Sequence, residues 1–473
     1  MLGLLAHMNL GAEKRLPEGV AKKDVKNIKI DSNIDPKTDE QISFTVNNDV
    51  KQYSTVKCLM VCVGNSNELL KVAKLLKFDL EFTDQLDVEI KKHDTELDAE
   101  KMANLSKQGF SLCLSLKELA KNESNKKDDK KDSQKNSKKN NIKNNIEVAI
   151  TLKDPSTSQV FFEKKVSWSD KTAIFDAHTM ADQLLPVLTG EKGPMLSTLA
   201  YCEQLSSKHK IICIADYACM KKRILVQNYT LNVAPCWHSK APILFFSQFT
   251  RRNSRLMSID IASKKQSIVC SYDGLNMQPS FSQDGIQAVL CLSGSGNSEL
   301  YFYDQTVCNK LKKRIFTPLT HNKGSNVSPC LLPNGDVVFC SDFETGYPQI
   351  YYLDQKKKST RVLTSGRGYC ASPSYCINSH AIIYSRYVRG VFQLFSLDIQ
   401  AKKPRERQLT FSTGDKLDPV WSPCGKYAAF SYNCPDKKGQ QIATLNCRSG
   451  KIKVLTTGKE PKSFPSWTGM QLF

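Results

Sequence analysis

The chain has 473 residues, 40% of them hydrophobic, and no apolar run approaches the roughly 18–20 residues that a membrane-spanning helix needs. Its net charge of +20 is spread along the sequence without an arginine-rich helix, a zinc-finger spacing or an aromatic RNA-binding strand, which argues against nucleic acid as the partner. Seventeen cysteines, an odd number with no C-x-x-C pair, argue against zinc and redox sites and are typical of a reducing compartment.

Residues 1–51 form a polar N-terminal tail in which acidic and basic residues nearly cancel. The first residues lack the basic start and the long apolar stretch of a signal peptide, so the sequence itself gives no sign of export. With no transmembrane segment expected, the protein is predicted to be peripheral to a membrane at most.

Residues 52–190 alternate between apolar runs and segments with helical spacing, which indicates a small α/β domain. The run VKCLMVCV at 56–63 predicts a buried strand, and the spacing over 67–80 predicts a helix. The Lys/Asn-rich stretch 121–145 contains nine lysines and four acidic residues. Such a composition predicts a disordered loop, which here separates two expected strands.

Residues 196–473 contain a repeat. A proline followed by a short aromatic or apolar strand recurs every 44 to 50 residues, at Pro235, Pro279, Pro329, Pro373, Pro419 and Pro465. A Leu-Thr pair precedes four of these prolines at a constant distance, and a polar residue ends an alternating run in each repeat, at Asp216, Asp260, Asp304, Asp354, Asp398 and Asn446. Four short strands in about 45 residues predict one blade of a β-propeller.

The fold class predicted is therefore mainly β, a C-terminal six-bladed β-propeller preceded by a small α/β domain. The last motif, Pro465-Ser466-Trp467, lacks following strands of its own. We expect it to supply the missing first strand of the first blade, because closing the ring removes free sheet edges. An open solenoid of stacked hairpins is the alternative.

The junction between the two parts carries a specific pattern: Ala-His-Thr in a helix, Leu-Thr-Gly-x-x-Gly at its exit, and an apolar-Ala-Tyr start of the first strand. In this chain these positions are Ala177, His178, Thr179, Leu188, Thr189, Gly190, Gly193, Leu199, Ala200 and Tyr201. Over about residues 52–473 the sequence resembles the TolB family of the Tol-Pal system. The resemblance implies a periplasmic, non-enzymatic scaffold that binds a Pal-like peptidoglycan-associated lipoprotein and supports outer-membrane integrity and cell division. A TolA-like inner-membrane protein is a further implied partner, although residues 1–50 show no match to the family's TolA-binding peptide.

In a propeller, the loops before the shared prolines surround the mouth of the central channel. Because TolB proteins contact Pal through such loops, the resemblance implies six partner-binding residues: Leu275, Asn276, Gln278, Asn326, Val327 and Ser328. No catalytic, cofactor-binding or metal-binding residue is predicted. His178 is expected to pack or hydrogen-bond at the domain junction, and the Asp column to accept backbone N–H bonds in turns.

Two other functions remain open. The first is a cytosolic propeller scaffold with a different partner, which would suit the cysteines; the net charge is interpreted mainly as solvation of the surface, with anionic polymers or membrane surfaces as a further option. A propeller-associated peptidase is disfavoured because G-x-S-x-G and the other common catalytic motifs are absent.

Overall fold

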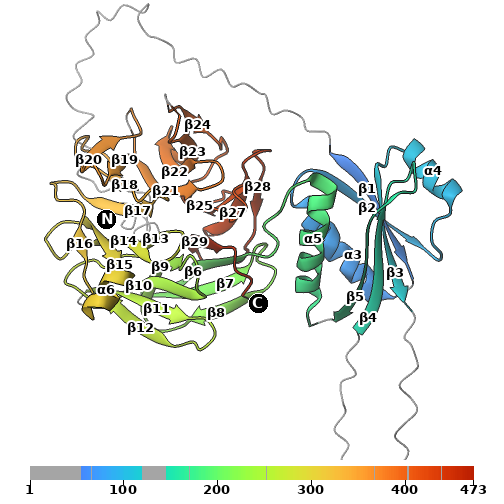
Figure 1. Cartoon of the computed structure of the whole chain (residues 1–473), viewed down its shortest axis with the longest axis horizontal. Coiled ribbons are helices and arrows are strands. Elements are labelled where there is room, and N and C mark those ends of the chain that lie inside the picture. The colour runs from blue at the N-terminus through green and yellow to red at the C-terminus, as the bar shows by residue number, and fades with distance from the viewer. Residues whose placement is uncertain are drawn as a thin grey trace, which may run out of the picture.

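The computed structural model describes residues 55–119 and 145–472, with gaps at 65, 170, 252, 367, 402–403 and 438. The expected N-terminal tail, 1–51, and the Lys/Asn-rich stretch, apart from the backbone of Asn145, lie outside the described residues. Figure 1 shows two bodies, a mixed sheet with helices and a ring of small sheets. No helix in the described part of the chain is long and apolar enough to cross a membrane.

The first body is a five-stranded sheet with the order β2-β1-β3-β4-β5. Strand β1 pairs in parallel with β2 and β3, whereas β3, β4 and β5 pair antiparallel. Its elements are β1 Val56–Val63, α3 Asn67–Glu81, β2 Leu86–His93, α4 Ala99–Lys107, β3 Leu112–Leu119, β4 Asn145–Lys153, β5 Val160–Ser169 and α5 Ala173–Thr189.

Strand β1 is apolar throughout because both of its faces are covered. Helices α3 and α5 lie on the sheet face that points toward the ring, and α4 lies on the other face (Figure 1). Helix α3 begins where the Ser66 hydroxyl accepts a hydrogen bond from the Leu69 N–H, and α4 begins where Asp98 caps the Lys101 N–H. Helix α5 ends at Gly190, whose φ of 72° is a left-handed conformation that favours glycine.

The second body consists of four four-stranded sheets and one eight-stranded sheet. The eight-stranded sheet contains β29 Lys462–Thr468, β6 Thr198–Ser206, β7 His209–Asp216, β8 Lys222–Val226, β9 Leu231–Trp237, β10 Ile243–Phe249, β11 Ser254–Asp260 and β12 Gln266–Cys270. The third repeat forms β13 Ser280–Phe281, β14 Gln287–Leu292, β15 Glu299–Asp304, the helix α6 Gln305–Leu311 and β16 Thr317–Pro318.

The remaining three repeats each form a separate sheet. The fourth contains β17 Asn326–Leu331, β18 Val337–Ser341, β19 Gln349–Asp354 and β20 Ser359–Val362. The fifth contains β21 Cys370–Cys376, β22 Ala381–Val388, β23 Val391–Asp398 and β24 Glu406–Gln408. The sixth contains β25 Lys416–Trp421, β26 Tyr427–Tyr432, β27 Gln441–Asn446 and β28 Ile452–Val454.

The C-terminal strand closes the ring, as predicted. Strand β29 pairs antiparallel with β6, with Trp467 opposite Leu199. The Trp467 indole is buried and donates a 2.8 Å hydrogen bond from Nε1 to the Ser197 hydroxyl. The last motif of the chain and the first strand of the array thus share one sheet.

Neighbouring repeats are also joined by the residue after the shared proline. The hydroxyl of Ser280 accepts the Leu331 N–H at 2.9 Å, and that of Ser374 accepts the Trp421 N–H at 3.3 Å. The Trp421 indole in addition donates to the Ser374 carbonyl at 3.1 Å. The aromatic residue of the P-x-W motif therefore anchors its repeat to the preceding one.

We call the two ends of the ring the turn end and the loop end. The turn end carries the connections between the first and second and between the third and fourth strands of each repeat; the loop end carries the connections between the second and third strands and those between repeats. The α/β body packs on the turn end. Phe82 stacks edge-on against Tyr217 and tilted against Tyr427, and the Asn446 amide donates to the Thr83 carbonyl at 3.0 Å. The loop end is consequently the end of the ring that the α/β body leaves uncovered.

Candidate functional site

Five of the six shared prolines follow a residue in the left-handed conformation. Ala234, Ser328, Ser372, Asp418 and Phe464 have φ between 51° and 55°. At each of them the register between the first and second strand shifts, which marks a β-bulge. The bulge bends the start of the first strand and fixes the loop that precedes it. In the third repeat Gln278 lacks this conformation, and strand β13 is reduced to two residues.

Three residues before each proline stands a buried residue whose side chain in most repeats holds the preceding loop. This column consists of Asn232, Asn276, Asn326, Cys370, Lys416 and Lys462. The Asn276 amide donates to the carbonyls of Tyr272 and Ser254 at 2.7 and 3.0 Å. The Asn326 amide donates to Glu299 Oε2 at 2.8 Å and to Asn322 Oδ1 at 3.0 Å.

Two of the six predicted contact residues are therefore buried, whereas a residue that contacts a partner is expected to be exposed. Asn276 and Asn326 are 0% exposed, so their side chains shape the loops rather than face a partner. Leu275, Gln278, Val327 and Ser328 are partly exposed at the loop end. Among the described residues, Oε1 of Gln278 is buried without a hydrogen-bond partner.

The Leu-Thr pairs of the sequence also shape this end. In four repeats the threonine hydroxyl accepts a backbone N–H from the third strand and donates to a Gln or Glu beside it. Thr410, for example, accepts from the Leu394 N–H at 2.9 Å and donates to Gln393 Oε1 at 2.7 Å. The other pairs are Thr320 with Glu299, Thr364 with Gln349 and Thr456 with Gln441. The Gln amides then donate to loop carbonyls, such as that of Ser412 at 2.8 Å.

Aromatic side chains gather on the loops that this scaffold holds. Within the described residues 198–472, every exposed Phe or Tyr lies at the loop end: Tyr229, Tyr272, Phe343, Tyr347 and Phe411. Tyr229 is 94% exposed and Phe411 68% exposed. Exposed aromatics clustered on one face are typical of a protein-binding surface.

A basic hollow adjoins these aromatics. Thr250, Arg251, Asn253, Arg255 and Asp273 line a cavity of about 440 Å³. Nε of Arg255 is buried and has no hydrogen-bond partner among the described residues. Because a guanidinium pairs well with a carboxylate, the hollow suits an acidic side chain of a partner.

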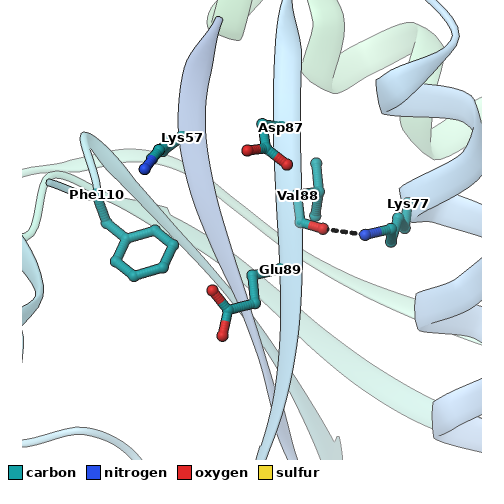
Figure 2. A pocket seen from close by; sticks show the side chains of 6 residues that line it. All are labelled: Lys57, Lys77, Asp87, Val88, Glu89 and Phe110. Carbon is teal, nitrogen blue, oxygen red and sulfur yellow. Dashed lines mark hydrogen bonds between the residues drawn. The ribbon is translucent and has the colours of Figure 1, made fainter. Parts of the chain in front are cut away.

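A second hollow lies on the sheet of the α/β body, and its side chains are less suited to binding a ligand. Figure 2 shows Lys57, Asp87, Glu89 and Phe110 on one side of the sheet and Lys77 on the other, around a volume of about 210 Å³. Lys77 donates to the Val88 carbonyl at the edge of the sheet. The neighbouring backbone N–H of Val88 is also bonded, to a helix carboxylate, Glu81 Oε1, at 3.0 Å. Side chains thus occupy hydrogen-bonding groups on the free edge of β2. The hollow is lined by both positive and negative side chains, which are not arranged to bind one ligand.

The residues that could suggest catalysis or a metal have structural roles. The imidazole of His178 is buried at the domain junction, 2.8 Å from Asp79 Oδ2, as expected for a packed histidine. The Asp column accepts backbone N–H bonds in the turns, as predicted; Asp354 accepts from Lys357 at 2.9 Å and Asp398 from Gln400 at 2.9 Å. Within the described ranges no cluster of His, Cys, Asp or Glu side chains is placed to hold a metal ion.

A family model described as the TolB beta propeller domain matches residues 186–471, more than half of the chain. The chain belongs to the TolB β-propeller family. It is 25% identical over 316 residues to the Tol-Pal system protein TolB of Francisella tularensis subsp. mediasiatica, covering 66% of this chain and 61% of that protein. It is also 27% identical over 142 residues to the Tol-Pal system protein TolB of Helicobacter pylori, covering 30% of this chain and 32% of that one.

The fold agrees with a solved structure as well. The crystal structure of TolB from Acinetobacter baumannii superposes with a TM-score of 0.71 at 19% identity, covering 88% of this chain and 96% of that one. At this identity the match shows the fold alone. The alignments to the Francisella proteins span about three fifths of the length of those relatives.

Proposed function

We propose that this TolB-family chain is a non-enzymatic scaffold of the Tol-Pal system that binds a Pal-like peptidoglycan-associated lipoprotein at the loop end of its propeller. In this role it would act in the periplasm and support outer-membrane integrity and cell division. Membership of the family and the names of the relatives support a place in the Tol-Pal system. A TolA-like inner-membrane protein is a second proposed partner.

One observation carries the proposal: the exposed aromatics of the ring lie at the end that the α/β body leaves free. A protein interface gains most of its affinity from a few aromatic and arginine anchors surrounded by polar residues. Tyr229 and Phe411 supply exposed anchors, and Arg251 and Arg255 supply positive charge at the same end of the ring. We propose that Leu275, Gln278, Val327 and Ser328 contact the partner at the inner margin of this surface.

We also infer six blades. The eight-stranded sheet divides into β29-β6-β7-β8 and β9-β10-β11-β12, and the halves are joined by a single parallel pair, Lys210 opposite Leu231. Each half has four strands, like the four other sheets. Counted this way, every proline repeat contributes the innermost strand of one blade.

The proposal is tested by measuring the affinity for the Pal-like lipoprotein encoded by the same organism. Replacing Tyr229 and Phe411 together by serine should weaken binding by about tenfold or more, because both lose a large contact area. The control replaces Ile224 and Ile268 by serine. These residues are about half exposed on the outer strands β8 and β12, away from the loop end, and their loss should leave binding unchanged.

A second pair of variants probes the inner margin. Changing Gln278 and Ser328 together to arginine should abolish capture of the lipoprotein while the thermal unfolding midpoint stays near that of the wild type. Unchanged capture by both loop-end variants would show that the binding face has been misplaced.

The cysteines favour a second candidate, a propeller scaffold of a reducing compartment. All 17 are free, and most are buried. Burial raises the pKa of Cys202 and of Cys236 to about 12, so these two thiols stay protonated at neutral pH, which is compatible with an oxidising compartment as well. Cell fractionation separates the two candidates: recovery with the peptidoglycan-linked envelope supports the Tol-Pal role, and recovery only with the cytosol contradicts it.

A further inference from the structure

The third repeat departs from the others at the turn end. Its third and fourth strands are separated by residues 305–316, twelve residues, whereas four to seven residues make this connection in the other repeats. The insertion contains helix α6 and the basic run Lys310-Leu311-Lys312-Lys313-Arg314. Figure 1 shows α6 at the rim of the propeller, on the side away from the α/β body.

The insertion is fixed to the propeller by several contacts. Asp304 caps α6 by accepting the Thr306 N–H at 2.8 Å, and the Lys313 N–H donates to the Cys308 carbonyl at 3.1 Å. Arg314 donates from Nη1 to the carbonyls of Ile268 and Val269 on the neighbouring strand β12, at 3.1 and 2.5 Å. The helix is thereby held against the rim.

The outer surface of the insertion combines apolar and basic side chains. Val307 and Leu311, four residues apart on one face of α6, are 46% and 57% exposed. Lys310, Lys312 and Lys313 are exposed around them, and none has an ion-pair partner among the described residues. The inward face of the same helix is occupied by the buried Cys308.

We infer that this rim element, Val307 to Lys313, binds the surface of a membrane that contains anionic phospholipid. Lysines near such a surface are attracted to the headgroups, and aliphatic side chains beside them can enter the boundary of the acyl chains. A nucleic acid fits less well, because its interfaces are polar and use aromatic stacking, whereas the exposed side chains between these lysines are aliphatic. The inference does not rest on the proposed partner at the loop end, which is a different surface.

The chain contains a matched control in the next repeat. Lys356, Lys357 and Lys358 form an exposed run of three lysines at the corresponding turn of the fourth repeat. There Lys357 lies 3.4 Å from Asp354, and the turn is a tight one without an exposed apolar pair. Replacing either set of three lysines by glutamine changes the net charge by the same amount, so general attraction of a basic protein to vesicles affects both variants alike.

The first experiment measures co-sedimentation of the full chain with vesicles of phosphatidylcholine alone or mixed with phosphatidylglycerol. The triple change K310Q/K312Q/K313Q should lower partition onto the mixed vesicles roughly hundredfold, about fivefold for each lysine. The triple change K356Q/K357Q/K358Q should lower it far less. Equal losses in the two variants, or no binding of the wild type to mixed vesicles, would overturn the inference.

The second experiment tests the apolar part. Leu311→Trp places an indole on the rim element, and Lys356→Trp places one on the control turn; the four native tryptophans are at most partly exposed. With brominated phospholipid in the mixed vesicles, the fluorescence of the Leu311→Trp protein should be quenched beyond that of the wild type, and that of the control should not. Quenching that is absent or equal in both contradicts insertion. Loss of oligonucleotide binding, rather than of vesicle binding, in the K310Q/K312Q/K313Q variant would assign the element to nucleic acid instead.

Discussion

Nδ1 of His178 in helix α5 lies 2.8 Å from Oδ2 of Asp79 in helix α3, and both side chains are buried. The Tyr217 hydroxyl, from the propeller, donates to the other carboxylate oxygen of Asp79 at 2.5 Å. Asp79→Ala would leave the imidazole and the phenol without this partner, and we expect the unfolding free energy to fall by about 3–5 kcal/mol. Urea denaturation measures the loss. Glu163→Ala, on the exposed edge strand β5, is the control and should change stability by less than about 0.5 kcal/mol.

The same histidine should make stability depend on pH. Burial alone would lower its pKa, but the carboxylates of Asp216 and Asp79 outweigh that effect and raise the pKa of His178 to about 9 from its usual 6.5. Since the folded protein holds this proton more tightly, the contribution is fully present below pH 6.5 and is lost as the pH rises through 9. It amounts to up to about 3 kcal/mol. The thermal midpoint should fall across this window, and His178→Gln should flatten that part of the profile; an unchanged profile would contradict the prediction.

Lys416 should give the opposite slope. Its side chain is buried and donates to the carbonyls of Ser412 and Thr413. Burial lowers the pKa of Lys416 from 10.5 to about 8. The unfolded chain therefore binds more protons between these values, and stability rises with pH across this window.

The repeats suggest a replacement for this lysine. Asparagine occupies the equivalent position in three other repeats, as in Asn276, and holds the loop without a charge. Lys416→Asn should raise the unfolding free energy at pH 7 by about 1–3 kcal/mol. The gain should shrink when denaturation is repeated at pH 9.5, and a gain independent of pH would contradict this explanation.

Much of the ring could be predicted because its signals are local. The Gly of the tight turn needs a positive φ, found at Gly285, Gly335 and Gly425, and the closing strand was visible as a motif without following strands. The burial of Asn276 and Asn326 could not be predicted from their neighbours, since polar residues between Gly and Pro are typical of exposed loops. In the structure each asparagine bonds the preceding repeat, Asn276 at the Ser254 carbonyl and Asn326 at the Glu299 carboxylate. The sequence indicates a shared structural role for these asparagines only when the repeats are aligned, because Asn recurs three residues before three of the shared prolines.

For a similar reason, the sequence reveals only the threonine of each hydrogen-bonded Thr and Gln pair. The threonines stood out as a column, but their Gln partners lie in the third strands, where an alternating pattern makes a polar residue look solvent-facing. In the structure Gln393 and Gln349 are buried, because they bond the threonine on one side and a loop carbonyl on the other. An alternating pattern thus locates the strand but does not show which of its polar side chains are buried.

These pairs should matter to stability. Thr410→Val keeps the shape of the side chain but leaves the Leu394 N–H and the Gln393 carbonyl oxygen without their partner. We expect a loss of about 2–4 kcal/mol, because each unsatisfied buried group costs about 1–3 kcal/mol. Amide exchange of Leu394 should accelerate as well. Thr457→Val, at an exposed position, is the matched control and should have little effect. Equal losses in the two variants would show that the hydrogen bonds of Thr410 do not contribute to stability.

Closure of the ring gives the last prediction. Deletion of residues 462–473 removes strand β29, which with β7 is what pairs with β6 in the described part of the chain, and exposes the edge that the closing strand covers. The shortened chain should lose its cooperative unfolding transition and aggregate. Trp467→Ala should lower the unfolding free energy by about 3–5 kcal/mol through the cavity it leaves. Trp467→Phe keeps most of the ring and loses chiefly the bond to Ser197, so about 1 kcal/mol is expected. If the deleted chain unfolded as cooperatively as the full one, the closing strand would not be what holds the first and last repeats together.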